Sequence, residues 1–517
     1  MPHSYQSTIR VGREEVSQVE VEVCQPKVCL EGLGCDHSST FVSWHILFMM
    51  STQEPTRDAD QLAEELEDVV LAAEDVDEVI DDDEDAPHDE EDEVKDPNGP
   101  VIEAEEGEPE ARPDTAISGT FLHTPGSAMF ALALHPTFPN PPLAVSGGQD
   151  DLGYLFCPLH PTLGSFNRDT FAPIPLRGHE DSVVAAAFSS DGEYVATGGL
   201  DGRVRVWRHA TPKRVQAAEG SADAWKYWEF VTSVEAGEVS WLKWHPKGPV
   251  LSAGCEDGTV WLWSLPSGRT MTVLSSHTME ATAGVFPPPA GKQLLTAALD
   301  STLVLWNPSA GVPEFKMTVF QPPGARSLDP AIHGITSLAV APNGALVAAG
   351  GANGKIKLVA IARGEVIDVK AEVVHTLEGH ERGESVEALA FVDLHGGSYG
   401  GKGVVLLSAG TDGRVILWDT TTGRMRQVMV HPEAITGMVC HPAPCHYLVT
   451  TACADRTLRT WDMRSGQLIA EHHGHAAAVN CVAVSPALDG DVSPLGLPQA
   501  QFIVSGGDEG ASLLFRI

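Results

Sequence analysis

The sequence predicts an all-β fold, an eight-bladed β-propeller closed by a strand from its N-terminal side, and three observations support this prediction. A short phrase recurs along the chain: an Asp-Gly turn, an alternating run, and a closing aromatic or apolar residue. Successive copies are spaced by 43 to 59 residues, as expected for a unit of about 40–45 residues with loop insertions. Glycine, which tight turns require, is abundant at 50 of 517 residues. The eight closing residues are Phe156, Trp207, Trp263, Trp306, Val359, Trp418, Trp461 and Phe515.

The second unit shows the predicted strands most clearly. Residues 182–188 form an apolar run, a turn follows, and residues 194–199 form a second run. A tight turn at residues 200–202 leads to residues 203–207, which alternate polar and apolar side chains as a half-buried strand does. We expect the same order in every unit, followed by a fourth, outer strand.

The last unit lacks residues for its own outer strand. Only Arg516 and Ile517 follow its closing residue, Phe515. Residues 115–124, ahead of the first unit, have the character of a spare strand, and we predict that they complete the last blade. Closing the ring in this way removes the exposed sheet edges that an open array would leave.

Each unit carries a polar residue six positions before its closing residue, and several carry an upstream histidine. The six-position residues are Asp150, Asp201, Asp257, Asp300, Asn353, Asp412, Asp455 and Glu509. Because the offsets agree from unit to unit, the chain resembles the WD-repeat family, and the resemblance implies structural tetrads of histidine, hydroxyl, carboxylate and tryptophan. The implied tetrads are His179/Thr197/Asp201/Trp207, His277/Thr296/Asp300/Trp306, His380/Ser408/Asp412/Trp418 and His431/Thr451/Asp455/Trp461.

A set of serine, histidine and aspartate also invites a catalytic interpretation, which we reject. A catalytic triad is a single geometry beside an oxyanion hole, whereas this set recurs from unit to unit and includes a tryptophan. The sequence has no G-x-x-x-x-G-K-[ST] phosphate loop, and the Gly-rich residues 395–403 lack the strand-loop-helix frame of a nucleotide site. We therefore predict no enzyme activity, no catalytic residues and no cofactor.

The formal net charge of −38 is extreme. It argues against direct binding of DNA or RNA, whose phosphates need lysine and arginine, and it favours a basic protein partner. The longest apolar stretch near the start, residues 41–50, is shorter than the about 20 residues that cross a bilayer and has no signal-peptide features. Nine cysteines without a regular framework indicate a reducing compartment. We expect a monomeric cytoplasmic protein and leave nuclear residence open.

A leader, residues 1–57, precedes the acidic tail and has no clear period. An alternative is that translation starts at Met49 or Met50, so that the preceding residues are a gene-model extension. The leader contains one loose C-x₄-C pair with an odd third cysteine, which falls short of the paired spacing of metal sites, so we predict no metal. The residues considered there are Cys24, Cys29, Cys35 and His37.

The acidic tail, residues 58–113, separates the leader from the propeller at residues 114–517. It carries 26 acidic residues and one base between Asp58 and Glu110. Such blocks repel themselves and stay disordered. Two interpretations remain open: a solvating tail, or an arm that forms an amphipathic helix on a basic partner. The apolar residues at helical steps are Leu62, Leu66, Val69, Val70, Ala73, Val76 and Ile80.

Two stretches narrow the resemblance within the WD-repeat family. Residues 235–268 of the third unit, and residues 355–366 of the fifth, where Val359 replaces tryptophan, resemble the family of the angio-associated migratory cell protein. The likeness covers residues 58–517. Fungal members of that family are ribosome-assembly factors that hold one newly made, basic large-subunit ribosomal protein. The resemblance therefore implies a protein-binding chaperone for a basic ribosomal protein.

Two other functions compete with this interpretation. One is a signalling or cytoskeletal scaffold linked to cell migration, which would bind several partners of ordinary charge with little dependence on salt. The other is a substrate adaptor in a ubiquitin ligase, which usually needs a second, recruiting domain, and residues 1–113 show none.

The loops that enter each blade's first strand are expected to open on one face, and an acid recurs in them. We predict that a basic partner binds there, although Asp181 has the alternative role of bracing its own turn. Trp241 and Trp244 share one strand and point to opposite sides of it, so we expect one in the core and the other free to be exposed. The predicted binding residues are Glu180, Asp181, Glu238, Glu280, Glu381, Glu384 and Glu433.

Overall fold

The computed structural model describes the predicted propeller from Thr115 onward. The predicted leader and acidic tail, the cysteines considered for a metal, and residues 395–402 lie outside the described part, so those predictions stay predictions. Within the described part, no helix has the length and apolar character that a membrane span needs. The described residues are 115–159, 172–210, 226–289, 291–320, 334–363, 369–394, 403–488, 493, 495 and 497–517.

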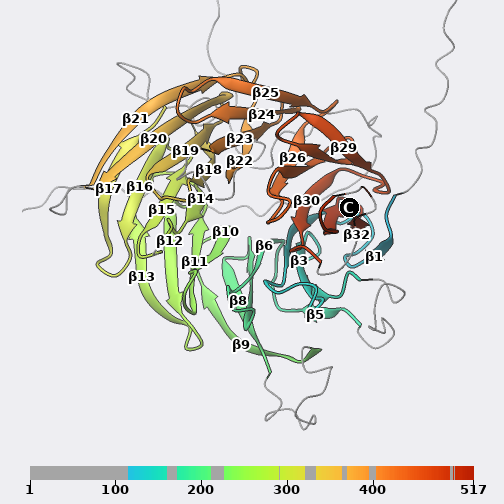
Figure 1. The fold of residues 1–517 in the computed structure, drawn as a ribbon. Helices are drawn as coiled ribbons and strands as arrows, with labels where there is room; N and C mark the ends of the chain where they lie inside the picture. The colour runs from blue at the N-terminus through green and yellow to red at the C-terminus, as the bar shows by residue number, and fades with distance from the viewer. Residues whose placement is uncertain are drawn as a thin grey trace, which may run out of the picture. The chain divides into compact units, whose positions relative to one another are not determined.

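The described strands form eight antiparallel sheets of four strands, and each sheet is one blade (Figure 1). Blade 1 contains β2 (Met129–Leu134), β3 (Ala144–Gly148), β4 (Gly153–Phe156) and β5 (Ile174–Leu176). Blade 2 contains β6 (Val183–Phe188), β7 (Tyr194–Gly199), β8 (Arg203–His209) and β9 (Trp228–Glu235). Blade 3 contains β10 (Val239–Trp244), β11 (Val250–Cys255), β12 (Thr259–Ser264) and β13 (Arg269–Ser275). Blade 4 contains β14 (Ala281–Val285), β15 (Leu294–Ala298), β16 (Thr302–Asn307) and β17 (Val312–Thr318).

The second half of the propeller repeats this order. Blade 5 contains β18 (Ile335–Val340), β19 (Leu346–Gly351), β20 (Lys355–Arg363) and β21 (Val369–Glu378). Blade 6 contains β22 (Val386–Asp393), β23 (Val404–Gly410), β24 (Arg414–Asp419) and β25 (Met425–Val430). Blade 7 contains β26 (Ile435–Cys440), β27 (Leu448–Cys453), β28 (Leu458–Asp462) and β29 (Gln467–His472). Blade 8 contains β30 (Val479–Val484), β31 (Phe502–Gly507), β32 (Ala511–Arg516) and, from the other end of the propeller, β1 (Ser118–Phe121).

The first strands of the blades form a closed inner ring. Each contacts the first strand of the next blade, and the last, β30, contacts β2 of blade 1. The eight closing residues predicted from the sequence lie on the third strand of their blades and are all buried. The eight-bladed fold predicted from the repeat is therefore confirmed.

The closing strand is also confirmed. β1 pairs antiparallel with β32, in a register that places Ser118 opposite Leu514 and Phe121 opposite Ala511. Thr115 extends the contact, because its N–H donates to the carbonyl of His473 at 3.1 Å. Figure 1 shows β1 beside β32, although nearly the whole propeller lies between them in sequence.

A bulge near the start of every inner strand joins neighbouring blades. Each inner strand shifts register between its first and third residues, as between Val239 and Trp241 in β10. Side chains at several of these bulges donate to the carbonyl of the first residue in the next inner strand. The donors are Trp241 to Ala281 at 2.8 Å, Thr282 to Ile335 at 2.7 Å, Thr336 to Val386 at 2.8 Å and Asn480 to Met129 at 3.4 Å.

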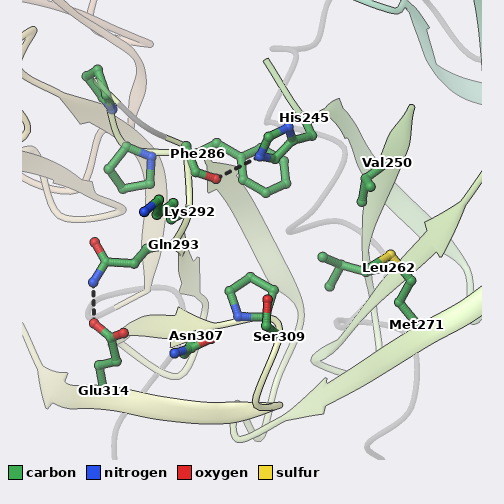
Figure 2. A pocket seen from close by; sticks show the side chains of 14 residues that line it. His245, Val250, Leu262, Met271, Phe286, Lys292, Gln293, Asn307, Ser309 and Glu314 are labelled. Carbon is green, nitrogen blue, oxygen red and sulfur yellow. Dashed lines mark hydrogen bonds between the residues drawn. The ribbon is translucent and has the colours of Figure 1, made fainter. Parts of the chain in front are cut away.

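A groove of about 690 Å³ lies between blades 3 and 4, at the ends of the strands away from the Asp-Gly turns (Figure 2). Its apolar lining includes Leu262 and Met271 from blade 3 and Phe286 from blade 4. His245 fixes its wall, because the imidazole Nε2 lies 3.0 Å from the carbonyl oxygen of Gly291 in the neighbouring blade.

Candidate protein-binding face

Eight backbone hydrogen bonds define one face of the ring. In each blade, a residue at the start of the turn between the second and third strands donates its N–H to the carbonyl just ahead of the inner strand. The N···O distances are all 2.9–3.0 Å, for example from Leu200 to Ser182 and from Glu256 to Glu238. The loop that enters each blade therefore lies beside its Asp-bearing turn. We call this surface the Asp-turn face.

The seven acids predicted to bind a partner all lie in loops of the Asp-turn face. Five of them are exposed, while Glu280 and Glu384 are half-buried. Two exposed acids pair with arginines from the adjacent turns: Glu180 accepts from Arg203 at 2.9 Å, and Glu381 accepts from Arg414 at 2.7 Å. The exposed ones are Glu180, Asp181, Glu238, Glu381 and Glu433.

Asp181 has the bracing role that the sequence left open. Its Oδ1 accepts the N–H of Ser182 at 2.7 Å and holds the loop just ahead of β6. Glu384 is similarly engaged, because it accepts the hydroxyl of Thr411 at 2.6 Å. The carboxylates of Asp181 and Glu384 are therefore fixed in position at the Asp-turn face by hydrogen bonds.

Acids of blades 1 to 3 lie close enough to affect one another's ionisation. A hydrogen bond with Glu256, together with burial and repulsion by Glu256 and Asp181, raises the pKa of Glu238 to about 7. Burial and repulsion by Asp181, Asp150 and Asp201 raise the pKa of Asp151. Both shifts show that the carboxylates crowd one another, and a cation placed among them would relieve this repulsion.

Beneath the Asp-turn face, blade 6 holds the full hydrogen-bonded chain that the resemblance implies. In blade 6, Nδ1 of His380 lies 2.9 Å from Asp412 and Nε2 lies 2.7 Å from the Ser408 hydroxyl, which accepts the Trp418 indole N–H at 2.9 Å. Each buried polar group thus has a partner, as a buried network requires.

Blade 2 has the histidine-centred part of this chain. Nδ1 of His179 lies 3.0 Å from Asp201, and Nε2 lies 2.8 Å from the Thr197 hydroxyl. Trp207 is buried and packs against Phe230 with the ring planes 71° apart.

Blade 4 departs from the direct chain. Nε2 of His277 lies 2.7 Å from Thr296, which accepts the Trp306 indole N–H at 2.8 Å. Nδ1 of His277, however, donates to Thr302 at 2.6 Å, and the Thr302 hydroxyl donates to Asp300. The histidine and carboxylate are 3.8 Å apart, so the threonine connects them.

Blade 7 inserts an arginine in the same place. Nη1 of Arg459 donates to Nδ1 of His431 at 2.7 Å and to Asp455 at 2.8 Å. His431 therefore carries its proton on Nε2, which lies 2.7 Å from Thr451, and Thr451 accepts the Trp461 indole N–H at 3.3 Å. Burial and repulsion by Arg459 lower the pKa of His431 to about 4.

Blades 1 and 8 contain two further chains that sequence reasoning did not assemble. Their histidines, His123 and His475, bridge a serine and an acid: Ser146 with Asp150, and Ser505 with Glu509. The sequence contains a signal for both chains, because a serine stands four residues before the acid in each, as Thr197 stands before Asp201. In blades 3 and 5 this position is alanine, at Ala253 and Ala349.

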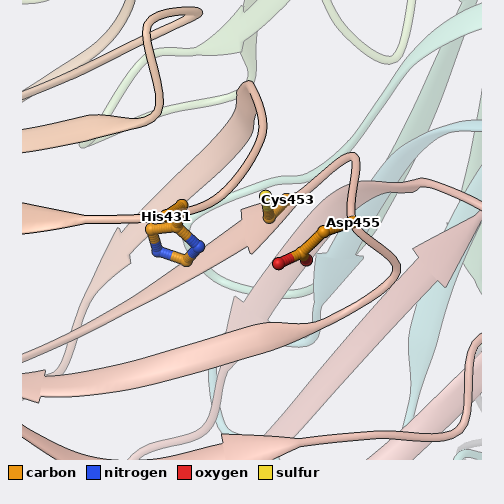
Figure 3. A group of neighbouring side chains, drawn as sticks. All are labelled: His431, Cys453 and Asp455. Atoms are coloured by element: carbon orange, nitrogen blue, oxygen red, sulfur yellow. The ribbon is translucent and has the colours of Figure 1, made fainter. Parts of the chain in front are cut away.

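His431, Cys453 and Asp455 bring three possible metal ligands within 4.8 Å of one another (Figure 3). Their chemistry does not fit a cation, because the Arg459 guanidinium already occupies the space between His431 and Asp455. Burial raises the pKa of Cys453 to about 12, which disfavours the thiolate that binds metals. This group is the altered tetrad of blade 7.

Of the two tryptophans on β10, Trp241 lies in the core, as expected for one of them, and Trp244 is half-buried. Both indoles donate to backbone carbonyls of neighbouring blades: Trp241 to Ala281 of blade 4 at 2.8 Å, and Trp244 to Ala187 of blade 2 at 3.1 Å. The opposite orientations were predicted correctly, but each side of an inner strand faces another blade. Neither tryptophan is therefore a free surface for a partner.

We expect Asp412→Asn to lower the free energy of unfolding by about 1–3 kcal/mol. Asp412 accepts from His380 and from the N–H groups of Glu381 and Arg414, at 2.9–3.1 Å. An amide keeps only one acceptor oxygen and turns its NH₂ toward a donor. Urea unfolding measures the change, with the exposed Glu372→Gln as control. Equal stability of the two variants would show that the network contributes nothing.

Family profiles of two kinds match the chain. The WD domain, G-beta repeat profile (WD40) matches residues 173–208, 330–359 and 371–419. The profile of the anaphase-promoting complex subunit 4 WD40 domain matches residues 222–286. All four matched ranges lie within the propeller.

Curated relatives cover most of the propeller. The chain is 28% identical to human angio-associated migratory cell protein over 399 residues, which are 76% of this chain and 79% of the relative. It is 33% identical over 403 residues to an uncharacterised WD repeat-containing protein of Schizosaccharomyces pombe. The match covers 78% of this chain and 86% of the relative. It is 27% identical over 415 residues to the ribosome assembly protein SQT1 of Saccharomyces cerevisiae. The match covers 77% of this chain and 86% of SQT1.

A solved structure shares the fold. Chaetomium thermophilum Sqt1, in a crystal structure bound to the N-terminus of the ribosomal protein L10, superposes with a TM-score of 0.62 at 24% identity. The match covers 78% of this chain and 100% of that one.

Proposed function

The chain belongs to the WD40-repeat family and is related to the angio-associated migratory cell protein and the yeast ribosome assembly protein SQT1, and on this premise we propose that it chaperones a basic large-subunit ribosomal protein. The propeller acts as a non-catalytic binding platform, and the Asp-turn face holds the client. The client is the basic N-terminal segment of an L10-type ribosomal protein, the ligand in the related fungal complex. The cytoplasm, where ribosomal proteins are made, is the place of binding, and escort into the nucleus follows.

The crowded carboxylates on blades 1 to 3 are the observation that carries this proposal. The pKa of Glu238 is raised by its hydrogen bond with Glu256, by burial and by repulsion from Glu256 and Asp181. The pKa of Asp151 is raised by burial and by repulsion from Asp181, Asp150 and Asp201. Lysine and arginine side chains of a client would stabilise those charges and speed association. An unassembled ribosomal protein is a polycation that binds RNA non-specifically, and an acidic platform shields it until delivery.

A capture experiment from cell extract tests the function. The baits are the full chain and a chain that begins at Asp114, each washed at low salt and at about 0.5 M salt, where exposed charge pairs are largely screened. We expect one basic large-subunit ribosomal protein to be enriched and to be lost at high salt. Enrichment of cytoskeletal or membrane-signalling proteins, with no ribosomal protein above background, would instead establish the scaffold function.

A three-site variant locates the client on the molecule. Asp181→Asn, Glu238→Gln and Glu256→Gln together remove charge from blades 2 and 3, and we expect about tenfold weaker binding of an L10 N-terminal peptide, from roughly 0.5 kcal/mol per exposed charge. The control is Glu193→Gln, an exposed acid that lies after the first strand of blade 2, away from the Asp-turn face. Fluorescence anisotropy of the labelled peptide measures the affinity of both variants. An equal loss of affinity in the control would mean that the client binds elsewhere.

Binding should also depend on pH near neutrality. Because the pKa of Glu238 is raised to about 7, the group is largely protonated at pH 6 and charged at pH 8. A basic client favours the charged form, so we expect affinity to rise several-fold from pH 6 to pH 8. Glu238→Gln should flatten this rise while Glu193→Gln keeps it, and a variant that retains the full rise would assign the titration to another group.

A further inference from the structure

We propose that the groove between blades 3 and 4 is the docking site of the chain's own acidic amphipathic segment, residues 62–80, which binds there as a helix. The groove lies on the face opposite the Asp-turn face, because the loops that form it alternate along the chain with the Asp-bearing turns. The inference does not rest on the proposed function, since it requires no client.

The groove offers an apolar floor between two rigid walls. Leu262 is buried at its base, while Met271, on the outer strand of blade 3, is 46% exposed at its rim. Phe286, Pro287 and Pro288 form the wall from blade 4. A groove of about 690 Å³ is within the range that takes ligand-sized groups, and apolar helix faces dock into such grooves through side chains at i, i+3, i+4 and i+7.

The charge around the groove is positive on a chain whose net charge is −38. In the described loops of blades 3 and 4 on this face, with their adjoining strand ends, Lys247, Arg269 and Lys292 are exposed bases. The single acid in those described stretches, Glu314, already accepts a hydrogen bond from Gln293. Figure 2 shows Lys292 inside the ring of lining side chains. An occupant with acids beside an apolar stripe fits this surface.

Residues 62–80 have that pattern. Leu62, Leu66, Val69, Val70 and Ala73 recur at helical steps, and the segment contains eight acids and no base. A helix lays such residues along one face and places Glu65, Glu67 and Glu74 on its flanks, beside the bases of the groove.

The link to the propeller is long enough for this contact. The 34 residues from 81 to 114 span up to about 110 Å when extended, and about 30–35 Å as a flexible coil. A domain of roughly 400 residues has a radius of gyration of about 21 Å. Tethering at this length gives a millimolar effective concentration, so a weak contact is enough to populate the docked state.

Photo-crosslinking of the full chain tests the proposal. Met271 is replaced by p-benzoyl-phenylalanine, the purified chain is irradiated, and the products are digested with trypsin. Cleavage after Arg57 and Lys95 releases the segment as a single peptide, residues 58–95, because no base lies between them. We expect this peptide to be the main intramolecular crosslink from position 271. The same amino acid at Val430, which is 61% exposed on blade 6, should not capture it.

Two variants separate specific docking from chance contact. Charge reversal at Lys247, Arg269 and Lys292 to Glu should lower the crosslink yield at least fivefold, with an unchanged thermal midpoint. The double variant Leu66→Asp with Val70→Asp should lower the crosslink yield by the same factor. Because it leaves the propeller sequence unchanged, it tests the proposal even if charge reversal prevents folding. Equal capture at positions 271 and 430, capture of other peptides, or crosslinks between isotopically distinct copies would each overturn the proposal.

Discussion

A chain that begins at Leu122 is expected to lose about 3–5 kcal/mol of unfolding free energy relative to one that begins at Asp114. The truncation removes β1, and with it the ladder to β32 and the contact of Thr115 with His473. About five hydrogen bonds are lost, each contributing roughly 0.5–1.5 kcal/mol. The loss is comparable with the whole stability of many domains, about 5–15 kcal/mol.

The measurement combines urea unfolding with hydrogen exchange. The amide groups of β32 should exchange faster in the shorter chain, whereas those of blade 4, across the ring, should change less. Exposing the β32 edge should also promote self-association, since unpaired edges template further pairing. Equal stability of the two chains would mean that the ring is held closed by the inner strands alone.

Arg459→Met is expected to be the most damaging single substitution in blade 7, at about 3–5 kcal/mol. The arginine side chain is 8% exposed and donates to His431, Asp455 and Glu471 at 2.7–2.8 Å. Its removal leaves Asp455, whose side chain is 11% exposed, without its cation. The matched control is Arg426→Met, which removes a 43% exposed arginine paired with Asp419 and should cost less than about 1 kcal/mol.

The difference between this variant and the natural chain should shrink as the pH falls from 7 to 5. In the natural chain, the pKa of His431 is lowered to about 4, so protonation of the unfolded chain, near pH 6.5, costs stability over this range. Without Arg459, the repulsion that lowers this pKa is gone, and a protonated His431 can pair with Asp455. Urea unfolding at both pH values checks this, and a gap that widens at pH 5 contradicts it.

The offsets between repeats predicted the architecture because they report backbone geometry. A closing residue on every third strand predicted the eight blades, and the strand-like residues 115–124 predicted the partner that β32 has in the structure. The repeat spacing places the strands and so predicts which positions are buried, but it does not predict the contacts of single side chains. Thr302 and Arg459 occupy ordinary alternating positions in the sequence, yet each inserts between a histidine and its carboxylate.

The sequence predicted which loops carry the acids of the candidate site. The acids on the Asp-turn face follow from the topology, since the loop entering each blade must lie beside its Asp-bearing turn. Which acids are neutralised does not follow, because the Glu180–Arg203 and Glu381–Arg414 pairs join residues more than 20 positions apart. The topology brings Glu238 and Glu256 to one end of blade 3, but the sequence could not predict the side-chain hydrogen bond between them that raises the pKa of Glu238.

The pairing of β1 with β32 sets the moment at which this protein can finish folding during its synthesis. Ser118 is made almost 400 residues before its partner Leu514. At about 5–20 residues per second, the closing strand waits roughly 20–80 s for its partner. Blades 1 to 7 have their own strands and can form in order, while the eighth waits until β32 has been made. During that interval β1 is an unpaired strand beside a growing row of blades, so truncated products would expose it permanently.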